Sequence, residues 1–297
     1  MATLRDIKRR ITAVQGTKKL TQAMKMIAAA KLRRAQDAIF AARPYSNKME
    51  IMLSDLASSV GEDYANPLIK TPKEVKSVAV IVISSDRGMC GSFNTNLLRI
   101  ALNYIRITFP EEFPGAQVSI IPVGRKACSF FRKEKLPVIK DYPGIFLKLK
   151  FTDAANIMDV VKKGFSDGKY DRVVVFYNEF VNLIKQLPSM KQLLPIVPTG
   201  KAKTQTTGFR TDYIFEPTQI EILDALLPKA INVKFWRMLL ESNAAEQAAR
   251  MIAMDNATTN ATELIKNLDM IYNKTRQASI TKEMLEIVGG ADALKKG

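Results

Sequence analysis

Apolar residues near the start of the chain recur at helical spacing. Four of them are separated alternately by three and four positions: Leu4, Ile7, Ile11 and Val14. This spacing places them on one stripe of an α-helix that can pack against a second helix. Beyond Gly16 the pattern predicts that the stripe changes phase and resumes at Leu20, Met24 and Ile27, followed by Ala28, Leu32, Ala35 and Ile39. We predict a single helix through about Ser58, which would be roughly 85 Å long at 1.5 Å per residue.

The last part of the chain shows the same spacing over a longer stretch. Between Thr218 and Val288 there is no glycine, and Pro228 is the single proline. The pattern predicts a first stripe at Phe235, Met238, Ser242, Ala245, Ala249 and Ile252, and a second at Met254, Ala257, Ala261, Leu264, Leu268 and Ile271. We expect Gly289 and Gly290 to end this helix after roughly 105 Å. Because both terminal segments carry apolar stripes, they are predicted to pack as an antiparallel coiled coil.

The middle of the chain alternates short apolar runs with helical patterns. Three runs are typical of buried parallel strands: Ser77–Ser84, Val118–Val123 and Arg172–Tyr177. The helical patterns are Asn94–Thr108, Lys126–Lys135 and Asp153–Ser166. Around Pro188, two edge strands are predicted at Phe180–Lys185 and Gln192–Val197, and Gly200–Gly208 is predicted to be a polar linker. The predicted fold class is therefore α/β, with a central Rossmann-like domain (59–217) between two coiled-coil helices (1–58 and 218–297).

Composition removes several classes of function. The chain has no histidine, and Cys90 and Cys128 lie far apart without C-x-x-C spacing, so neither a zinc site nor a Ser-His-Asp triad is expected. We predict no catalytic residue, no cofactor and no metal, and two buried free thiols. No run of about 18 apolar residues lacks charge, so no membrane span is predicted. Seven charged residues within positions 1–20 likewise argue against a signal peptide.

The net charge of +16 is concentrated at the start of the chain. Residues 1–58 hold twelve basic and four acidic side chains, whereas residues 218–297 hold ten of each. The first helix carries a basic cluster: Lys18, Lys19, Lys25, Lys31, Arg33 and Arg34. This excess is too large for pairing within one helix, so an acidic partner is predicted: nucleic acid, an anionic membrane or an acidic protein surface.

The loop Ser84–Asn94 follows the first predicted strand and precedes a helix, where α/β folds bind phosphates. It matches neither G-x-G-x-x-G nor the P-loop pattern, which argues against nucleotide binding. Two other interpretations stay open. The loop is either a tight turn in which Gly88 and Gly91 supply permissive backbone, or a surface that presents Asp86 and Arg87 to a protein partner.

Four stretches, taken in order, resemble the gamma subunit family of F-type ATP synthases: Ala23–Ala29, Ser85–Gly91, Glu246–Met254 and Ile280–Ala291. The resemblance covers nearly the whole chain. It implies a non-catalytic central-stalk rotor that couples proton or sodium flow through a membrane c ring to ATP synthesis or hydrolysis. The terminal helices would lie inside a hexamer of alpha and beta subunits, and the α/β domain would lie beside epsilon and on the c ring, with delta a further partner of the complex.

The resemblance also implies roles for particular residues. Contacts with beta subunits are expected from Arg276 and Gln277, from the loop residues Asp86 and Arg87, and from Lys18, Lys19, Lys25 and Lys31. The segment Asp212–Pro217, with Tyr213, Phe215 and Glu216, would contact the c ring and epsilon. The tip that turns in an apolar collar would comprise Val288, Gly289, Gly290, Ala291 and Leu294.

Two alternatives to the rotor interpretation remain. A basic coiled-coil arm could bind nucleic acid, although no aromatic residue that could stack on bases occurs before Phe40. An α/β enzyme could instead use a nucleotide at the loop Ser85–Gly91. Under the rotor interpretation the expected location is the cytoplasmic face of a bacterial plasma membrane. The chain would be held there peripherally, through its complex, and would bind no nucleic acid.

Overall fold

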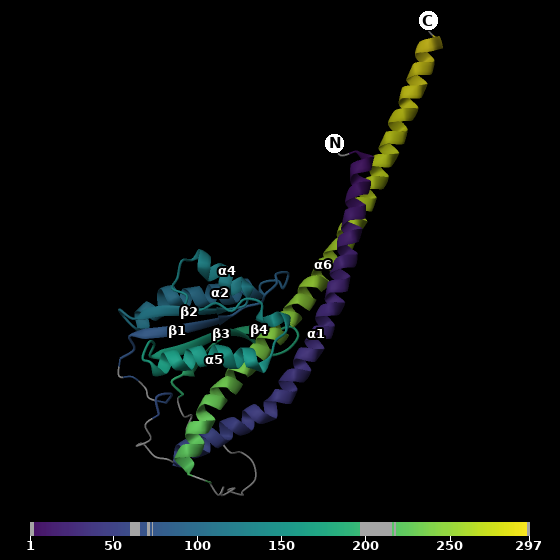
Figure 1. The fold of residues 1–297 in the computed structure, drawn as a ribbon. Helices are drawn as coiled ribbons and strands as arrows, with labels where there is room; N and C mark the ends of the chain where they lie inside the picture. Colours follow the sequence, from purple (N-terminus) through teal and green to yellow (C-terminus); the bar gives the residue numbers. More distant parts are fainter. Residues whose placement is uncertain are drawn as a thin grey trace. The chain divides into compact units, whose positions relative to one another are not determined.

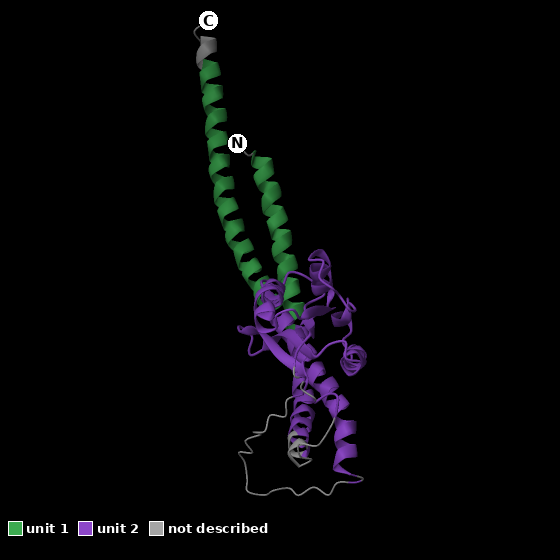
Figure 2. Cartoon of the chain, turned by 90° about the vertical axis from the view of Figure 1, so that its left-hand side faces the viewer, with its two compact units in different colours: residues 1–29, 250–297 green, residues 30–249 purple. Residues whose placement is uncertain are grey.

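The computed structural model describes residues 3–59, 66–69, 72, 74–196, 216 and 218–295. Helix α1 (Leu4–Ser59) and helix α6 (Gln219–Lys295) confirm the two long terminal helices (Figure 1). Pro44 lies inside α1 and Pro228 inside α6, and both helices continue past them. The chain packs as two compact units, residues 1–29 with 250–297 and residues 30–249 (Figure 2). The limits 59 and 217 for a central domain stay a prediction.

Residues 30–249 contain a four-stranded sheet in the order β2-β1-β3-β4. Its strands are β1 (Ser77–Ile83), β2 (Gln117–Val123), β3 (Arg172–Phe180) and β4 (Gln186–Leu194). The helical segments among them are α2 (Phe93–Asn103), a π-helical turn η1 (Tyr104–Thr108), α3 (Phe109–Glu112), α4 (Arg125–Lys133), a 3-10 turn η2 (Ile145–Leu147) and α5 (Phe151–Ser166). Strand β1 is parallel to both β2 and β3, so the predicted parallel α/β sheet is confirmed.

The prediction of two edge strands around Pro188 is wrong. One strand, β4, pairs antiparallel with β3, and Pro188 lies within it opposite Asn178. Because β4 is at the edge of the sheet, a residue without an N–H can be accommodated there. Phe180 is the last residue of β3, and residues 181–185 connect the two strands. The predicted linker at 200–208 lies outside the described residues.

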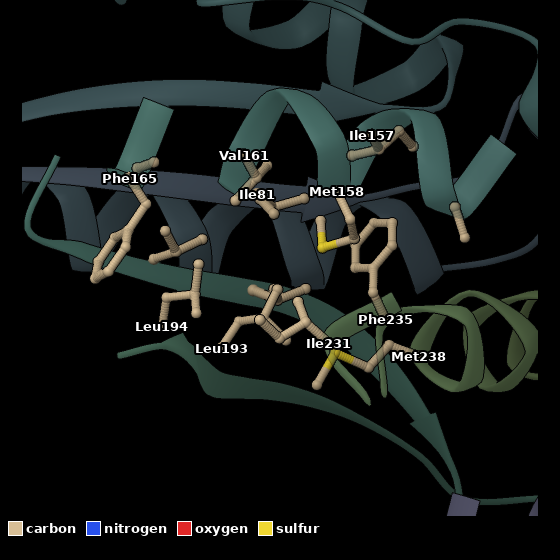
Figure 3. Close-up of a cluster of buried hydrophobic side chains, with 14 of the residues drawn as sticks. Ile81, Ile157, Met158, Val161, Phe165, Leu193, Leu194, Ile231, Phe235 and Met238 are labelled. Atoms are coloured by element: carbon tan, nitrogen blue, oxygen red, sulfur yellow. The ribbon is translucent and has the colours of Figure 1, made fainter. Parts of the chain in front are cut away.

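The central strand β1 is covered on both faces. Its residues from Val78 to Ile83 are all 0% exposed and point alternately into two apolar clusters. One cluster contains side chains of α5 and α6, including Ile157, Met158, Ile231 and Phe235 (Figure 3). The other contains side chains of α2 and α4. The sheet therefore joins α6 to the rest of this unit through direct apolar packing.

In the unit formed by residues 1–29 and 250–297, α1 and α6 run antiparallel, as predicted (Figure 2). The predicted phase change after Gly16 does not occur. The later members of the predicted stripe, Ala28, Leu32, Ala35 and Ile39, are buried, but they continue in phase with Ile7 and Thr21. Leu20 and Ile27 are 61% and 57% exposed. The reason is that a coiled-coil stripe keeps its 3-4 period, and here Thr21 occupies the inward position and is hydrogen-bonded.

Two predictions for α6 also need correction. The helix does not end at Gly289 and Gly290 but continues to Lys295. Neither glycine adopts the positive φ that ends a helix. In the second predicted stripe, Met254 and Ala261 are buried, but Leu264 and Ile271 are 47% and 51% exposed.

Gly164, in α5, allows close packing against Tyr170. A Cβ at this position would lie 2.0 Å from Tyr170 Oη. That hydroxyl donates to the Val160 carbonyl at 3.2 Å, and burial raises the pKa of the phenol to about 12. We expect Gly164→Ala to lower the free energy of unfolding by about 1–3 kcal/mol, because Tyr170 must move. Urea denaturation followed by circular dichroism measures this change.

Gly16→Ala is the matched control. A Cβ on Gly16 meets nothing within 4 Å, and alanine is favoured over glycine inside a helix by about 1 kcal/mol. The control variant should be at least as stable as the unchanged chain. Equal stability of the Gly164→Ala variant and the unchanged chain would contradict the packing described here.

Candidate functional site

The loop that follows β1 lies against the start of α4. The first three backbone N–H groups of α4 all donate to this loop: to Asp86 Oδ1 at 2.9 Å, to the Ser85 carbonyl at 3.1 Å and to Ser84 Oγ at 2.7 Å. An anion site at a helix N-terminus requires N–H groups that can point at the ligand. At α4 these groups are already used, so the start of this helix is not arranged as a phosphate cradle.

Asp86 connects three segments of this unit. Besides the Arg125 N–H, its carboxylate accepts hydrogen bonds from the N–H groups of Gly144 at 2.7 Å and Phe146 at 2.8 Å. Sequence reasoning assigned Asp86 only to an outside partner and missed this internal role. The sequence did contain a signal for this role. Asp86 comes just after a buried strand, and aspartate is a residue that commonly caps helices. Arg87, beside it, is exposed, and the contact predicted for the two residues stays a prediction.

The rest of the loop is a tight, internally bonded turn. The Asn94 side chain accepts from the Ser85 N–H at 3.0 Å and donates to Cys90 Sγ at 3.2 Å. The left-handed conformation occurs at Gly91 and at Met89, not at Gly88. Of the interpretations left open, the tight turn is therefore confirmed, with one of the two expected glycines in the special conformation. Cys90 and Cys128 are both buried, and neither takes part in a disulfide.

The hydrogen bonds of Asp86 lead to a prediction about stability. Asp86→Ala leaves three backbone N–H groups without their acceptor, and we expect it to lower the free energy of unfolding by about 2 kcal/mol or more. Asp86→Asn keeps one carbonyl oxygen as an acceptor, so it should lower the free energy of unfolding by less. Thermal unfolding should therefore give the lowest midpoint for Asp86→Ala and an intermediate one for Asp86→Asn.

Asp141→Ala is the control for this series, because Asp141 makes a single, largely exposed ion pair with Arg132. Its unfolding midpoint should lie above those of both substitutions at Asp86. Equal stability of the Asp86→Ala and Asp141→Ala variants would contradict the role described for the Asp86 carboxylate.

In the two-helix unit, polar side chains join α1 to α6. Lys25 Nζ lies 2.6 Å from Asp255 Oδ1, and Thr21 Oγ1 lies 2.8 Å from Thr258 Oγ1. The ion pair is substantially exposed, so its contribution is about 0.2–1 kcal/mol. Its importance is positional, since both contacts are satisfied in one register only. Lys25, which the sequence assigned to an outside partner, already pairs with Asp255 within the chain.

The other residues singled out from the sequence lie on helix surfaces. Lys19, Lys31, Arg276 and Gln277 are exposed, and Lys18 is half-buried. Lys31 belongs to residues 30–249, whereas the other four belong to the two-helix unit. At the end of α6, Val288, Gly289, Gly290 and Ala291 are exposed. Glu216 is exposed as well, while Tyr213, Phe215 and the Leu294 side chain lie outside the described residues.

Large apolar side chains are also exposed in the two-helix unit. On α1, Leu20, Met26 and Ile27 are 57–63% exposed. On α6, Leu285 and Ile287 are 68% and 71% exposed, in a part of the helix that extends beyond the start of α1 (Figures 1 and 2). Contiguous exposed apolar surface marks contact sites for other molecules. The sequence pattern placed Leu20 and Ile27 in the seam between the helices and therefore did not predict that they are exposed.

Within the described part of the chain, no three cysteine, aspartate or glutamate side chains gather closely enough to hold a metal ion.

Among the described helices, none combines the length and the apolar character that crossing a membrane requires.

Two long helices joined to a small, mostly parallel sheet, with basic and apolar side chains exposed along the helices, are the features of a helical stalk protein. A family model described as ATP synthase matches residues 3–294. The ATP synthase gamma chain of Chlorobium phaeobacteroides is 48% identical over 295 residues, covering 99% of this chain and 100% of the relative. That of Chlorobaculum tepidum is 47% identical, with both chains fully covered. The chain belongs to the ATP synthase gamma chain family.

Solved structures support the fold. A chain of the Euglena gracilis mitochondrial ATP synthase, from a structure of its OSCP, F1 and c ring, superposes with a TM-score of 0.67 at 20% identity. The match covers 98% of this chain and 94% of the other. A chain of the Tetrahymena thermophila mitochondrial ATP synthase, from its central stalk and c ring, gives a TM-score of 0.59 at 24% identity, covering 80% and 99%. The coiled-coil and α/β architecture predicted from sequence is thus confirmed.

Proposed function

We propose that this chain is the central-stalk rotor subunit of an F-type ATP synthase. In this role it couples proton or sodium flow through a membrane c ring to ATP synthesis or hydrolysis at a hexamer of alpha and beta subunits. The observation that carries the proposal is the end-to-end match, near half identity, to ATP synthase gamma chains. The structural neighbours come from assemblies described as a central stalk, a rotor and a c ring.

The surface of the two-helix unit supports a role inside a larger assembly. The apolar side chains of Leu20, Met26 and Ile27 are exposed to solvent, although they belong to a helix that packs against α6. The same helix carries a strong excess of positive charge. Together these features suit a surface covered by other subunits that have apolar and acidic groups.

A rotor can control three catalytic sites only if it contacts them differently. A shaft that touched each site equally would bias none of them. The two helices of this chain differ in the required way: α1 is strongly basic, whereas residues 218–297 carry ten basic and ten acidic side chains. This difference supports a mechanism in which the subunit itself performs no catalysis and changes its partners through unequal contacts.

The proposed partners are the alpha and beta subunits, epsilon, delta and the c ring. The proposed location is the cytoplasmic face of a bacterial plasma membrane, where the chain would be peripheral and held through the complex. The comparisons give no support to the alternative of a nucleic-acid-binding arm. The internal bonding of the loop 84–94 likewise does not favour a nucleotide-using enzyme.

Purification of the native complex tests the proposed function. The chain, carrying an affinity tag and expressed in its own organism, should be isolated from membrane extract together with alpha and beta subunits and with ATPase activity. The chain alone should hydrolyse no ATP. Isolation of a lone monomer, or salt-sensitive binding of RNA as the main association, would contradict the proposal.

A double substitution tests the proposed contact at Arg276 and Gln277. Both side chains are exposed, so Arg276→Ala with Gln277→Ala should leave folding and assembly intact. Loss of their hydrogen bonds to a beta subunit should weaken the coupling of hydrolysis to rotation. We expect ATP-driven proton pumping per ATP hydrolysed to fall severalfold in membrane vesicles.

The control is a second exposed cation–amide pair on the same helix, Lys266→Ala with Asn267→Ala. It should leave the ratio of pumping to hydrolysis unchanged. If both double variants pump, hydrolyse and assemble like the unchanged complex, the contact assigned to Arg276 and Gln277 is wrong.

A further inference from the structure

A pocket of about 420 Å³ lies within residues 30–249, between α1, α6 and the strands β3 and β4. Its walls come from one face of α1 around Met49, one face of α6 from Leu223 to Glu241, and the side chains of Tyr177, Lys191 and Leu193. This volume lies in the range of pockets that bind small organic molecules.

The pocket has an apolar interior. Most of its apolar lining residues are buried, among them Leu193 at 1%, Leu227 at 2% and Ile231 at 1% exposed. Leu193, Ile231 and Met238 belong to the apolar cluster beneath the sheet and lie together in it (Figure 3). Because these walls are already fixed by core packing, an apolar ligand would enter a preformed site and bury its surface there.

Charged side chains stand around this interior. Arg237 and Glu241 neutralise each other, with 2.9 Å between Nε and Oε1. Lys191 lies 3.5 Å from Glu179. Lys234 is different: among the residues that the structure describes, no carboxylate lies within 4.0 Å of its ammonium. It faces Glu50 and Lys191 at longer range, and desolvation lowers the pKa of its ammonium.

We propose that this pocket binds a single-chain amphiphile with an anionic head group, the carboxylate pairing with Lys234 and the apolar chain lying against Leu193, Leu227 and Ile231. A cationic head is disfavoured because it would be repelled by the Lys234 ammonium, whereas Lys191 and Arg237 are already paired with Glu179 and Glu241. A neutral head could accept a hydrogen bond from the Lys234 ammonium but would bring no opposite charge. The arrangement therefore selects for a negative charge.

Titration of the full-length chain with decanoate tests the proposal. Binding is measured by isothermal titration calorimetry and by the fluorescence of Trp236, the single tryptophan, which packs against the same apolar cluster. We expect saturable binding with one site, at least tenfold weaker for decanol and weaker again for decyltrimethylammonium. Failure of decanoate to saturate, or equal affinity for decanol, overturns the proposal.

Three variants separate the charge from the cavity. Lys234→Met should weaken decanoate binding about tenfold or more, because a charge-assisted contact is lost. Ala230→Leu fills the pocket and should abolish binding of both decanoate and decanol. Lys266→Met removes a lysine of the same helix that does not line the pocket, and it should bind as the unchanged chain does.

Circular dichroism shows whether each variant is folded. If the folded Lys234→Met variant binds decanoate with unchanged affinity, the head-group assignment is wrong. The last experiment repeats the decanoate titration on the native complex that is isolated with the tagged chain. Persistent binding there supports a ligand site, whereas binding that disappears on assembly shows that another subunit covers the pocket and overturns the proposal.

Discussion

Strand β1 has no side that faces water, and the structure of residues 30–249 follows from the need to cover both of its faces. Alternate side chains from Val78 to Ile83 enter opposite clusters. Helices α2 and α4 supply one cover, while α5 and α6 supply the other. A terminal helix thus takes the place that a crossover helix fills in many parallel sheets. Removing α6 would expose the part of this face that α5 does not cover.

Much of this fold could be predicted because strong patterns determine it. Uninterrupted apolar runs such as Val78–Ile83 occur almost only in strands buried on both faces. The missed details depend on tertiary context. Pro188 is acceptable in β4 only because that strand is at an edge, and Gly289–Gly290 remain helical because neither adopts a positive φ. Neither condition can be read from local residues.

The phase of the coiled-coil stripe shows a second limit of sequence reasoning. Hydrophobicity alone favoured Leu20 and Ile27 as inward residues, yet Thr21 and Lys25 lie nearer the partner helix and are satisfied by Thr258 and Asp255. A polar residue can be assigned to the seam only if its partner on the other helix is known. Here each partner is more than 200 positions away in the sequence. The same reasoning explains Asp86, whose acceptor role depends on segments far along the chain.

The polar contacts in the two-helix unit have a mechanical consequence. Two helices joined only by apolar surfaces can roll or slide against each other with little change in buried area. A hydroxyl pair such as Thr21–Thr258 and an ion pair such as Lys25–Asp255 are satisfied at one relative rotation and one axial offset. Twisting one helix against the other would therefore lengthen these bonds, so they oppose such a twist at these positions.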